Sequence, residues 1–483
     1  MRLRPALAGL GVLAATCTVA GLLPTATAGN DYSDPAYAQH DADNLTRGRG
    51  AQLYEATTPS YTSDFVAAAA DSSGRHAAKQ LSELRKGRVY GGLSGYVPTY
   101  GGTGDPELYF AMNPRRVHFL SRTGAKLQGH VWGADGTAKK PGVVITPGSI
   151  QGSDQMYWWA AIALARAGYV VMTFDAQGQG QSETVGHEAG SFAPTAEGVP
   201  FQQEQNFVDG SVDALRFFLS TPTQPYVPGG WNADQVSAAR AAAAGEHVDW
   251  VNPGSVVVDP RQIGIAGHSL GARAVSVVQQ CSDRGTAWRK VEACGGRSYP
   301  IKAVVGWDTL SASVTPVVPG LDLRADGYFL SPTAAPMAPD PTESLAAFTA
   351  WRTAKVDSQV VVVRAGTHLE FSHVPFHGPS TRYGQDLAAY YTVAWMDRYV
   401  PLSRGQRDRG FAALVGGPAA TPELPHSANH FSVRRLSALA VSSPRTGRTT
   451  TAVDLRAFAG RSKVGDWVGA NADTVGSEVP PGR

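Results

Sequence analysis

The chain has 483 residues, of which 43% are hydrophobic and 17% charged, and its formal net charge is +2. This composition supplies enough apolar material for a sizeable core and excludes a disordered chain. The small net charge gives no reason to expect a nucleic acid or an anionic membrane surface as a partner.

The first segment has the features of a secretory signal peptide. Arg2 and Arg4 precede an apolar stretch, and Ala26-Thr27-Ala28 forms a small-x-small cleavage site. We expect residues 1–28 to be removed by cleavage after Ala28 and the mature protein to be secreted. The remaining sequence has no uninterrupted apolar run long enough to span a bilayer, so we expect no integral membrane anchor.

The rest of the chain divides into a main domain between two extensions. Residues 29–115 are polar and rich in glycine and tyrosine, apart from one predicted helix over 65–86, and we interpret them as an N-terminal extension. Residues 116–402 form the main domain, and residues 403–483 a C-terminal extension. Within the main domain, residues 183–260 contain stretches rich in glycine, proline and alanine. Two interpretations of these stretches stay open: a lid or rim over the site, or plain surface excursions.

In the main domain, short apolar strands alternate with helices. A hairpin is predicted over 117–132. The predicted strands after it are 143–146, 169–174, 263–266, 303–307, 321–325 and 360–363, and the predicted helices are 157–167, 203–219, 270–280 and 387–399. This alternation predicts an α/β fold with a mostly parallel central sheet and helices on both faces. In the C-terminal extension, strands are predicted over 431–441 and 450–458, joined by a turn at 444–447.

The sequence Gly267-His268-Ser269-Leu270-Gly271 matches the G-x-S-x-G pattern of a nucleophile elbow. The pattern alone arises by chance, but here it directly follows a predicted strand and directly opens a predicted helix, as the elbow requires. Side chains at 267 and 271 would collide with the neighbouring strand and helix, which explains the two glycines. We therefore predict that Ser269 is a nucleophile in a strained conformation. The alternative is a turn serine without chemistry.

A serine hydroxyl needs a base to take its proton, and in proteins with this elbow the acid and then the histidine follow the serine along the chain. His368 is the predicted base because its loop directly follows the predicted strand 360–363. His373 is the second candidate. The other histidines after the elbow are interpreted as surface or structural residues: His377, His426 and His430.

Two aspartates are candidates for the acid that orients the base. Asp308 directly follows Trp307 at the end of the predicted strand 303–307, and Asp326 follows the weaker segment 321–325. We favour Asp308 because its strand is the clearer of the two.

Acyl transfer also needs N–H donors for the oxyanion. The backbone N–H of Leu270, directly after the nucleophile, is the first predicted donor. The N–H of Ser149, in the loop Pro147-Gly148-Ser149 after the strand 143–146, is the second. We assign Trp158, Trp159 and Trp307 to the substrate pocket, with membership of the hydrophobic core as the alternative.

Two cysteines remain after removal of the signal peptide, Cys281 and Cys294. An exported protein folds under oxidising conditions, so we expect a disulfide bond between them, with two free thiols as the alternative. No group of cysteines and histidines has the spacing of a zinc site, so we predict no metal.

The loop Pro147-Gly148-Ser149, the turn Asp175-Ala176-Gln177-Gly178-Gln179-Gly180-Gln181-Ser182 and the elbow, in this order, resemble the α/β-hydrolase superfamily. The resemblance covers roughly residues 116–400. One similar branch is the group of secreted bacterial lipases, cutinases and polyester hydrolases, which implies an acid near Asp326. The other is the plasma-type platelet-activating-factor acetylhydrolases, which resemble this chain at Trp307-Asp308 and at Arg364-Ala365-Gly366-Thr367-His368-Leu369-Glu370-Phe371 and imply Asp308 as the acid.

These residues and the resemblance predict a secreted, monomeric hydrolase of carboxylic esters, an esterase or lipase that acts through an acyl-enzyme. It would need no cofactor, and its substrate would be a small molecule, a lipid or a polyester. Two alternatives stay open. One is a secreted peptidase or amidase on the same fold, and the other is a binding protein with a decayed hydrolase site.

Overall fold

The computed structural model describes residues 77–79, 81–88, 106–149, 153–191, 194–198, 203–243, 247–325, 345–363, 368–372, 384–416 and 438–452. The predicted signal peptide and most of the predicted N-terminal extension lie outside these residues. Residues 77–79 and 81–85 are helical, within the predicted helix 65–86. Among the described helices, none combines the length and the apolar character needed to cross a membrane.

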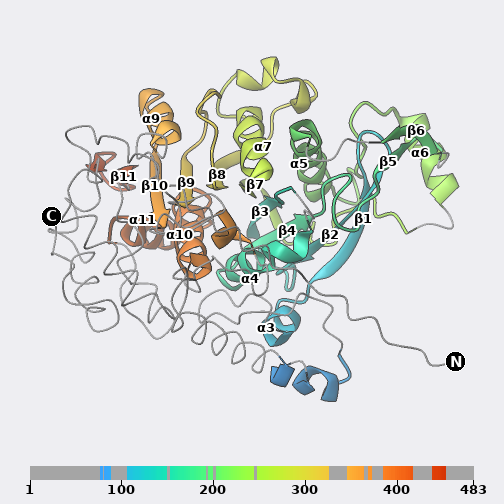
Figure 1. The fold of residues 1–483 in the computed structure, drawn as a ribbon, viewed down its shortest axis with the longest axis horizontal. Coiled ribbons are helices and arrows are strands. Elements are labelled where there is room, and N and C mark those ends of the chain that lie inside the picture. The colour runs from blue at the N-terminus through green and yellow to red at the C-terminus, as the bar shows by residue number, and fades with distance from the viewer. Residues whose placement is uncertain are drawn as a thin grey trace, which may run out of the picture.

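A ten-stranded sheet forms the centre of the molecule (Figure 1), in the order β1-β2-β4-β3-β7-β8-β9-β10-β11-β12. The six strands β4, β3, β7, β8, β9 and β10 run parallel to one another. The strands at the two ends of the sheet, β1 and β2 at one and β11 and β12 at the other, join it through antiparallel pairs. The predicted α/β class with a mostly parallel sheet is therefore confirmed. The strands are β1 (Arg115–Leu120), β2 (Lys126–Trp132), β3 (Lys140–Thr146), β4 (Val170–Phe174), β7 (Val258–His268), β8 (Ile301–Trp307), β9 (Gly320–Ala325), β10 (Ser358–Val363), β11 (Ala438–Ser442) and β12 (Thr449–Ala452).

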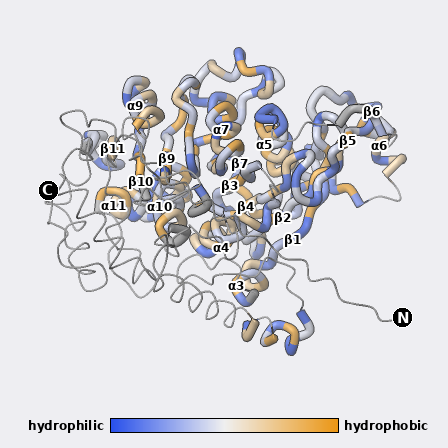
Figure 2. The backbone as a smooth tube through the Cα atoms, viewed as in Figure 1, coloured by the Kyte–Doolittle hydropathy of each residue, from blue (hydrophilic) through white to orange (hydrophobic). Residues whose placement is uncertain are grey.

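Helices cover both faces of the sheet, as predicted (Figure 1). Alternate residues of a strand point to opposite faces. Val143 and Ile145 of β3 accordingly belong to one buried cluster with α4 and α10, and Val144 between them belongs to a second cluster with α5 and α7. Figure 2 shows hydrophobic and hydrophilic residues mixed along the helices that cover the sheet, such as α5 and α7. The helices are α3 (Pro106–Ala111), α4 (Trp158–Arg166), α5 (Glu204–Phe218), α6 (Ala233–Ala242), α7 (Leu270–Val278), α9 (Ala346–Thr353), α10 (Gly384–Tyr399) and α11 (Arg404–Gly416).

The predicted elements of the main domain occur with shifted ends; the largest shift is at β7, which begins at Val258 and not at residue 263. The hairpin is formed by β1 and β2, whose last pair is Leu120 with Lys126. Helix α4 starts one residue later than predicted, because residues 154–157 form a 3-10 turn before it. Helix α7 ends at Val278, and residues 279–281 continue as a 3-10 turn.

Outside α5 and the start of β7, several segments of residues 183–260 are fastened to the hairpin of β1 and β2. Strands β5 (Val185–His187) and β6 (Pro194–Gly198) form a separate two-stranded sheet. The backbone N–H of His187 donates to the carbonyl of Thr123, in the β1–β2 turn, at 3.0 Å. Asp249 lies beside β1, where its N–H donates to the carbonyl of His118 at 2.6 Å and its carboxylate accepts the N–H of His118 at 2.8 Å. The hydroxyl of Tyr226 donates to the carbonyl of Leu120 at 2.6 Å.

Part of the predicted C-terminal extension belongs to the central sheet. Strands β11 and β12 lie where strands are predicted and are joined by a turn in which Gly447 has a φ of +68°. Strand β11 pairs antiparallel with β10, with Val360 opposite Ala438. This segment therefore extends the sheet beyond its parallel part.

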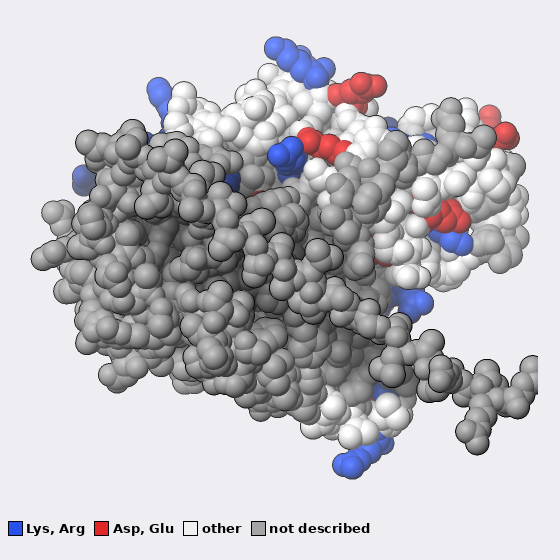
Figure 3. Space-filling model, in the orientation of Figure 1, with Lys and Arg blue, Asp and Glu red and all other residues white. Residues whose placement is uncertain are grey.

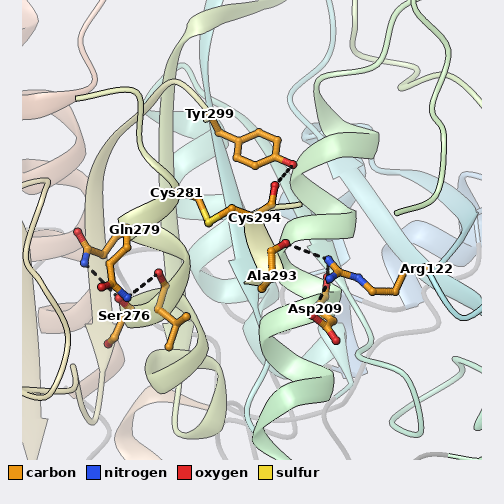
Figure 4. The surroundings of a disulfide bond; sticks show 10 residues. Arg122, Asp209, Ser276, Gln279, Cys281, Ala293, Cys294 and Tyr299 are labelled. Atoms are coloured by element: carbon orange, nitrogen blue, oxygen red, sulfur yellow. Dashed lines mark hydrogen bonds and ion pairs between the residues drawn. A yellow bond between two sulfur atoms is a disulfide. The ribbon is translucent and has the colours of Figure 1, made fainter. Parts of the chain in front are cut away.

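Cys281 and Cys294 form a disulfide bond, as predicted, with their Cα atoms 5.5 Å apart (Figure 4). Both residues are buried. The bond closes the connection between α7 and β8. Next to Cys294, the carbonyl of Ala293 accepts a hydrogen bond from Arg122 at 3.4 Å, and the Arg122 guanidinium also pairs with Asp209 of α5 at 2.8 Å. The connection is thereby held against the helix that neighbours α7.

Candidate active site

Ser269 lies in the tight turn between β7 and α7. Its φ of 56° and ψ of −121° place it among the few described residues other than glycine with a positive φ. Such a backbone costs about 1–3 kcal/mol and persists only where the surroundings enforce it. The N–H of Ser269 donates to the carbonyl of Trp307 at 3.0 Å, which ties the turn to the end of the neighbouring strand β8. The strained conformation predicted for Ser269 is present.

The two glycines of the elbow are required by steric contact. A Cβ atom at Gly267 would collide with the carbonyl of Gly271, and a Cβ at Gly271 would collide with the carbonyls of Thr146 and Pro147. The start of α7 thus lies directly against the end of β7 and against the loop after β3. Only residues without a side chain permit this approach.

Asp308 and His368 form a buried pair at the same edge of the sheet. Asp308 directly follows β8, and His368 begins a 3-10 helix, His368–Phe371, that comes after β10. Nδ1 of His368 and Oδ2 of Asp308 are 2.7 Å apart, and the residues are 5% and 9% exposed. A carboxylate can only accept, so Nδ1–H is the donor and Nε2 carries the lone pair. This tautomer leaves Nε2 of His368 able to accept a proton.

Two charged residues of β9 that were not singled out in the sequence lie around Asp308. Nε of Arg324 is 3.4 Å from Oδ1 of Asp308, and a guanidinium N–H of Arg324 donates to the hydroxyl of Thr309 at 2.6 Å. Asp322 accepts the N–H of Leu310 at 2.9 Å and the hydroxyl of Thr309 at 3.1 Å. Their signal in the sequence is two charges at alternate positions of an otherwise apolar strand.

These contacts shift the pKa values of both aspartates. Burial opposes the charge on Asp308, but the hydrogen bond from His368 and the charges of His368 and Arg324 outweigh burial and hold the pKa of Asp308 below its ordinary value. Burial raises the pKa of Asp322 to about 6, against the opposite effect of Arg324. The carboxyl group of Asp322 therefore takes up a proton at a higher pH than that of Asp308.

A chain of hydrogen bonds joins the loop after β3 to the elbow and to His368. The N–H of Gly148 donates to the hydroxyl oxygen of Tyr157 at 2.8 Å. The same oxygen is 2.8 Å from Nδ1 of His268, whose Nε2 is 3.0 Å from the carbonyl oxygen of His368. The rings of His268 and His368 lie 4.5 Å apart. The candidate base is thereby held beside the residue that precedes Ser269.

The hydrogen bonds of the loop 147–149 leave one backbone donor for an oxyanion. Pro147 has no N–H, and the N–H of Gly148 is used by Tyr157. The N–H of Ser149 is the remaining donor of this loop. Leu270 is the first residue of α7, where a helix has no carbonyl of its own to accept the N–H. The backbone N–H groups of Ser149 and Leu270 thus take no part in the described hydrogen bonds, and their role as oxyanion donors stays a prediction.

The three tryptophans assigned to the substrate pocket are buried. Trp158, Trp159 and Trp307 are 3%, 1% and 0% exposed and belong to the core cluster beneath α4 and α10. The indole N–H of Trp307 donates to the hydroxyl of Thr392 of α10 at 3.1 Å. This burial favours the alternative that the sequence left open, in which the rings are core residues.

Some predicted candidates lie outside the described residues. The alternative acid, Asp326, and the second candidate for the base, His373, are among them, as are His377, His426 and His430. Their relation to Ser269 stays a prediction.

One group of described side chains has ligand atoms close enough to hold a metal ion. One ligand atom from each of His118, His247 and Asp249 lies within 4.8 Å of the others. The carboxylate of Asp249 already accepts the N–H of His118 and is 3.4 Å from Nε2 of His247, so pairing at the β1 edge explains the group. On the face shown in Figure 3, the described charged side chains are scattered, some beside a charge of the opposite sign and some alone.

No protein-family model matches this chain. A comparison with curated proteins also gives no match.

Proposed function

We propose that this chain is a secreted serine hydrolase of the α/β-hydrolase type that cleaves carboxylic esters through an acyl-enzyme. Ser269 is the nucleophile, His368 the base and Asp308 the acid. The observation that carries the proposal is the buried pair of His368 and Asp308, at 2.7 Å. Asp308 directly follows Trp307, whose carbonyl accepts the N–H of Ser269, a serine with a strained backbone at a strand-to-helix turn.

Two further features support this proposal. The three residues come from the ends of β7, β8 and β10, which run parallel, so their loops meet at one edge of the sheet. The order serine, acid, histidine along the chain is the one that the hydrolase resemblance implies. The buried Asp308 keeps the imidazole in the tautomer that a general base needs.

In the proposed mechanism, Nε2 of His368 takes the proton of the Ser269 hydroxyl as the hydroxyl oxygen attacks the ester carbonyl. Asp308 stabilises the imidazolium that forms. The N–H groups of Leu270 and Ser149 donate to the oxyanion. His368 then gives its proton to the leaving alcohol, and a water molecule, activated by the same base, releases the acid and restores Ser269.

The test is hydrolysis of short nitrophenyl esters by the Ser269→Ala variant. We expect kcat to fall at least ~10⁴-fold because the covalent step is lost. The matched control is Ser237→Ala, which removes an exposed hydroxyl that donates to the carbonyl of Ala233 on α6. Its activity should stay at the wild-type level. Wild-type activity in Ser269→Ala would overturn the proposal.

Two measurements separate the alternatives. Parallel assays with nitrophenyl esters and with peptide or anilide substrates distinguish an esterase from a peptidase or amidase. A fluorophosphonate probe should label Ser269 in the intact protein. A chain that remains unlabelled, with no hydrolysis of any of these substrates, would favour the binding protein with a decayed site.

A further inference from the structure

The buried hydrogen-bond chain from Gly148 to His368 has one allowed direction. The carbonyl oxygen of His368 can only accept, so Nε2 of His268 carries its hydrogen. Burial and the charge of His368 lower the pKa of His268 to about 3, so this imidazole is neutral near pH 7 and Nδ1 is an acceptor. The hydroxyl of Tyr157 therefore donates to Nδ1, and its oxygen accepts the N–H of Gly148. Each donor and acceptor in this series of hydrogen bonds therefore has a partner.

Tyr157 and His268 are closely packed by their surroundings. Tyr157 and His268 are 1% and 3% exposed. The Tyr157 ring stacks on Trp307, with 5° between the ring planes. A Cβ atom at Gly148 would lie 2.9 Å from the Tyr157 hydroxyl oxygen and 3.0 Å from Nδ1 of His268. The loop after β3 approaches this closely because position 148 is a glycine.

This series of hydrogen bonds joins the three loops that carry the proposed catalytic residues. Gly148 precedes the oxyanion donor Ser149, His268 precedes the nucleophile, and the accepting carbonyl belongs to His368 itself. We propose that Tyr157 and His268 are positioning residues that hold the oxyanion loop and the backbone of the base at a fixed separation from Ser269. This inference rests on the proposed function. It predicts that the hydroxyl of Tyr157 affects turnover and not substrate binding, since neither residue has a surface for substrate.

The central test is the Tyr157→Phe variant, which keeps the ring and its packing and removes only the hydroxyl. We expect kcat for a short nitrophenyl ester to fall about 10- to 100-fold and KM to change by less than about threefold, because a small misplacement of catalytic groups lowers turnover. The matched control is Tyr226→Phe, which removes another buried hydroxyl, one that donates to the carbonyl of Leu120. The Tyr226 ring belongs to the buried cluster on the opposite face of the sheet. Its kcat should stay near the wild-type value even if its Tm falls.

Substitution of His268 supplies a second, independent test. The Gln side chain in His268→Gln can still donate to the carbonyl of His368, whereas His268→Ala cannot. We therefore expect His268→Gln to retain at least about fivefold more kcat than His268→Ala at unchanged KM. Equal kcat in the two variants, or a loss in Tyr157→Phe that appears entirely in KM, would overturn the positioning role.

The rate of labelling by a fluorophosphonate separates this inference from the proposed function. Wild-type protein should be labelled at Ser269, and Tyr157→Phe should be labelled about 10-fold more slowly, while Tyr226→Phe keeps the wild-type rate. Labelling of Tyr157→Phe at the wild-type rate would overturn the positioning role alone. Failure of the wild-type protein to be labelled at Ser269 would overturn the proposed function together with it.

Discussion

At Asp308, two opposing effects act on one carboxyl group. Burial disfavours its charge, and the hydrogen bond from His368 together with the charges of His368 and Arg324 favours it more strongly, so its pKa is lowered. The proposed mechanism requires this outcome. Only a charged carboxylate can stabilise the imidazolium that forms when His368 takes the serine proton.

The assignment of the acid is tested by Asp308→Asn and Asp326→Asn. The amide in Asp308→Asn keeps the size of the side chain but removes its charge, and its NH₂ group can favour the wrong imidazole tautomer. We expect kcat to fall about 10³- to 10⁴-fold. Asp326→Asn should retain wild-type kcat. The reverse result, with both variants folded by circular dichroism, would make Asp326 the acid.

Local chemistry made several site residues predictable. The elbow glycines and Ser269 stand in a five-residue pattern between a strand and a helix that can be read directly from the sequence, and the order of the strands pointed to Asp308 and His368. The roles of Tyr157 and His268 were not predicted. Their hydrogen bond joins positions 111 residues apart, and nothing local marks such a pair before the chain is folded.

The contact of α7 with the loop after β3 sets the geometry of the elbow. A methyl group at position 271 would meet the carbonyls of Thr146 and Pro147, so relief requires movement of the helix or of the loop. Either movement would displace Ser269 from Ser149, because each residue is carried by one of these two elements.

We predict that Gly271→Ala lowers the free energy of unfolding by about 1–3 kcal/mol, as overpacking does, and also lowers kcat. The control is Gly405→Ala in α11, where a Cβ would meet only Arg409, at 3.9 Å. Alanine favours a helix over glycine by about 1 kcal/mol, so this variant should be as stable as the wild type or more so. Urea unfolding of both variants gives the comparison. A Gly271→Ala protein with unchanged stability and kcat would contradict the steric argument.

The elements of the parallel sheet were predictable because buried strands are continuous apolar runs and the helices between them are amphipathic. The partners of β11 and β12 were not. Both were predicted as strands, but the pairing of β11 with β10 joins residues far apart in sequence, and the strand pattern alone does not specify it. The 3-10 turn before α4 was also not predicted, because the predicted helix began at residue 157 and the residues before it were assigned to no element.

Over the whole molecule, two buried groups give opposite dependences of stability on pH. The pKa of His268 is lowered to about 3 from an ordinary value of 6.5. The contribution of the neutral His268 to the free energy of unfolding is therefore complete above pH 6.5 and is lost as the pH falls toward 3. The pKa of Asp322 is raised from 3.8 to about 6. The contribution of the protonated Asp322 to the free energy of unfolding is therefore complete below pH 3.8 and is lost as the pH rises through 6. Between pH 4 and 6 the two effects oppose each other.

If one of the two groups is substituted, the pH dependence of stability should be that caused by the other group. In Asp322→Asn, the free energy of unfolding should rise more steeply between pH 4 and 6 than in the wild type, by about 1.4 kcal/mol per pH unit. In His268→Gln, the slope should change by a similar amount in the opposite direction. Urea unfolding at pH 4, 5 and 6 measures both slopes. Slopes that match the wild type in both variants would show that these groups do not set the pH dependence.

The contacts of Asp249 along β1 have a consequence for how copies of this protein meet. An outer strand presents unpaired N–H and C=O groups on which a strand from another molecule can grow, and this is a common start of aggregation. At His118 both groups are already satisfied within the chain, by the carboxylate and the N–H of Asp249, and the carbonyl of Leu120 is taken by Tyr226. Tyr226 and Asp249, from the connection between α5 and β7, thus occupy this part of the outer strand, and we expect them to hinder strand-to-strand association of copies of the protein there.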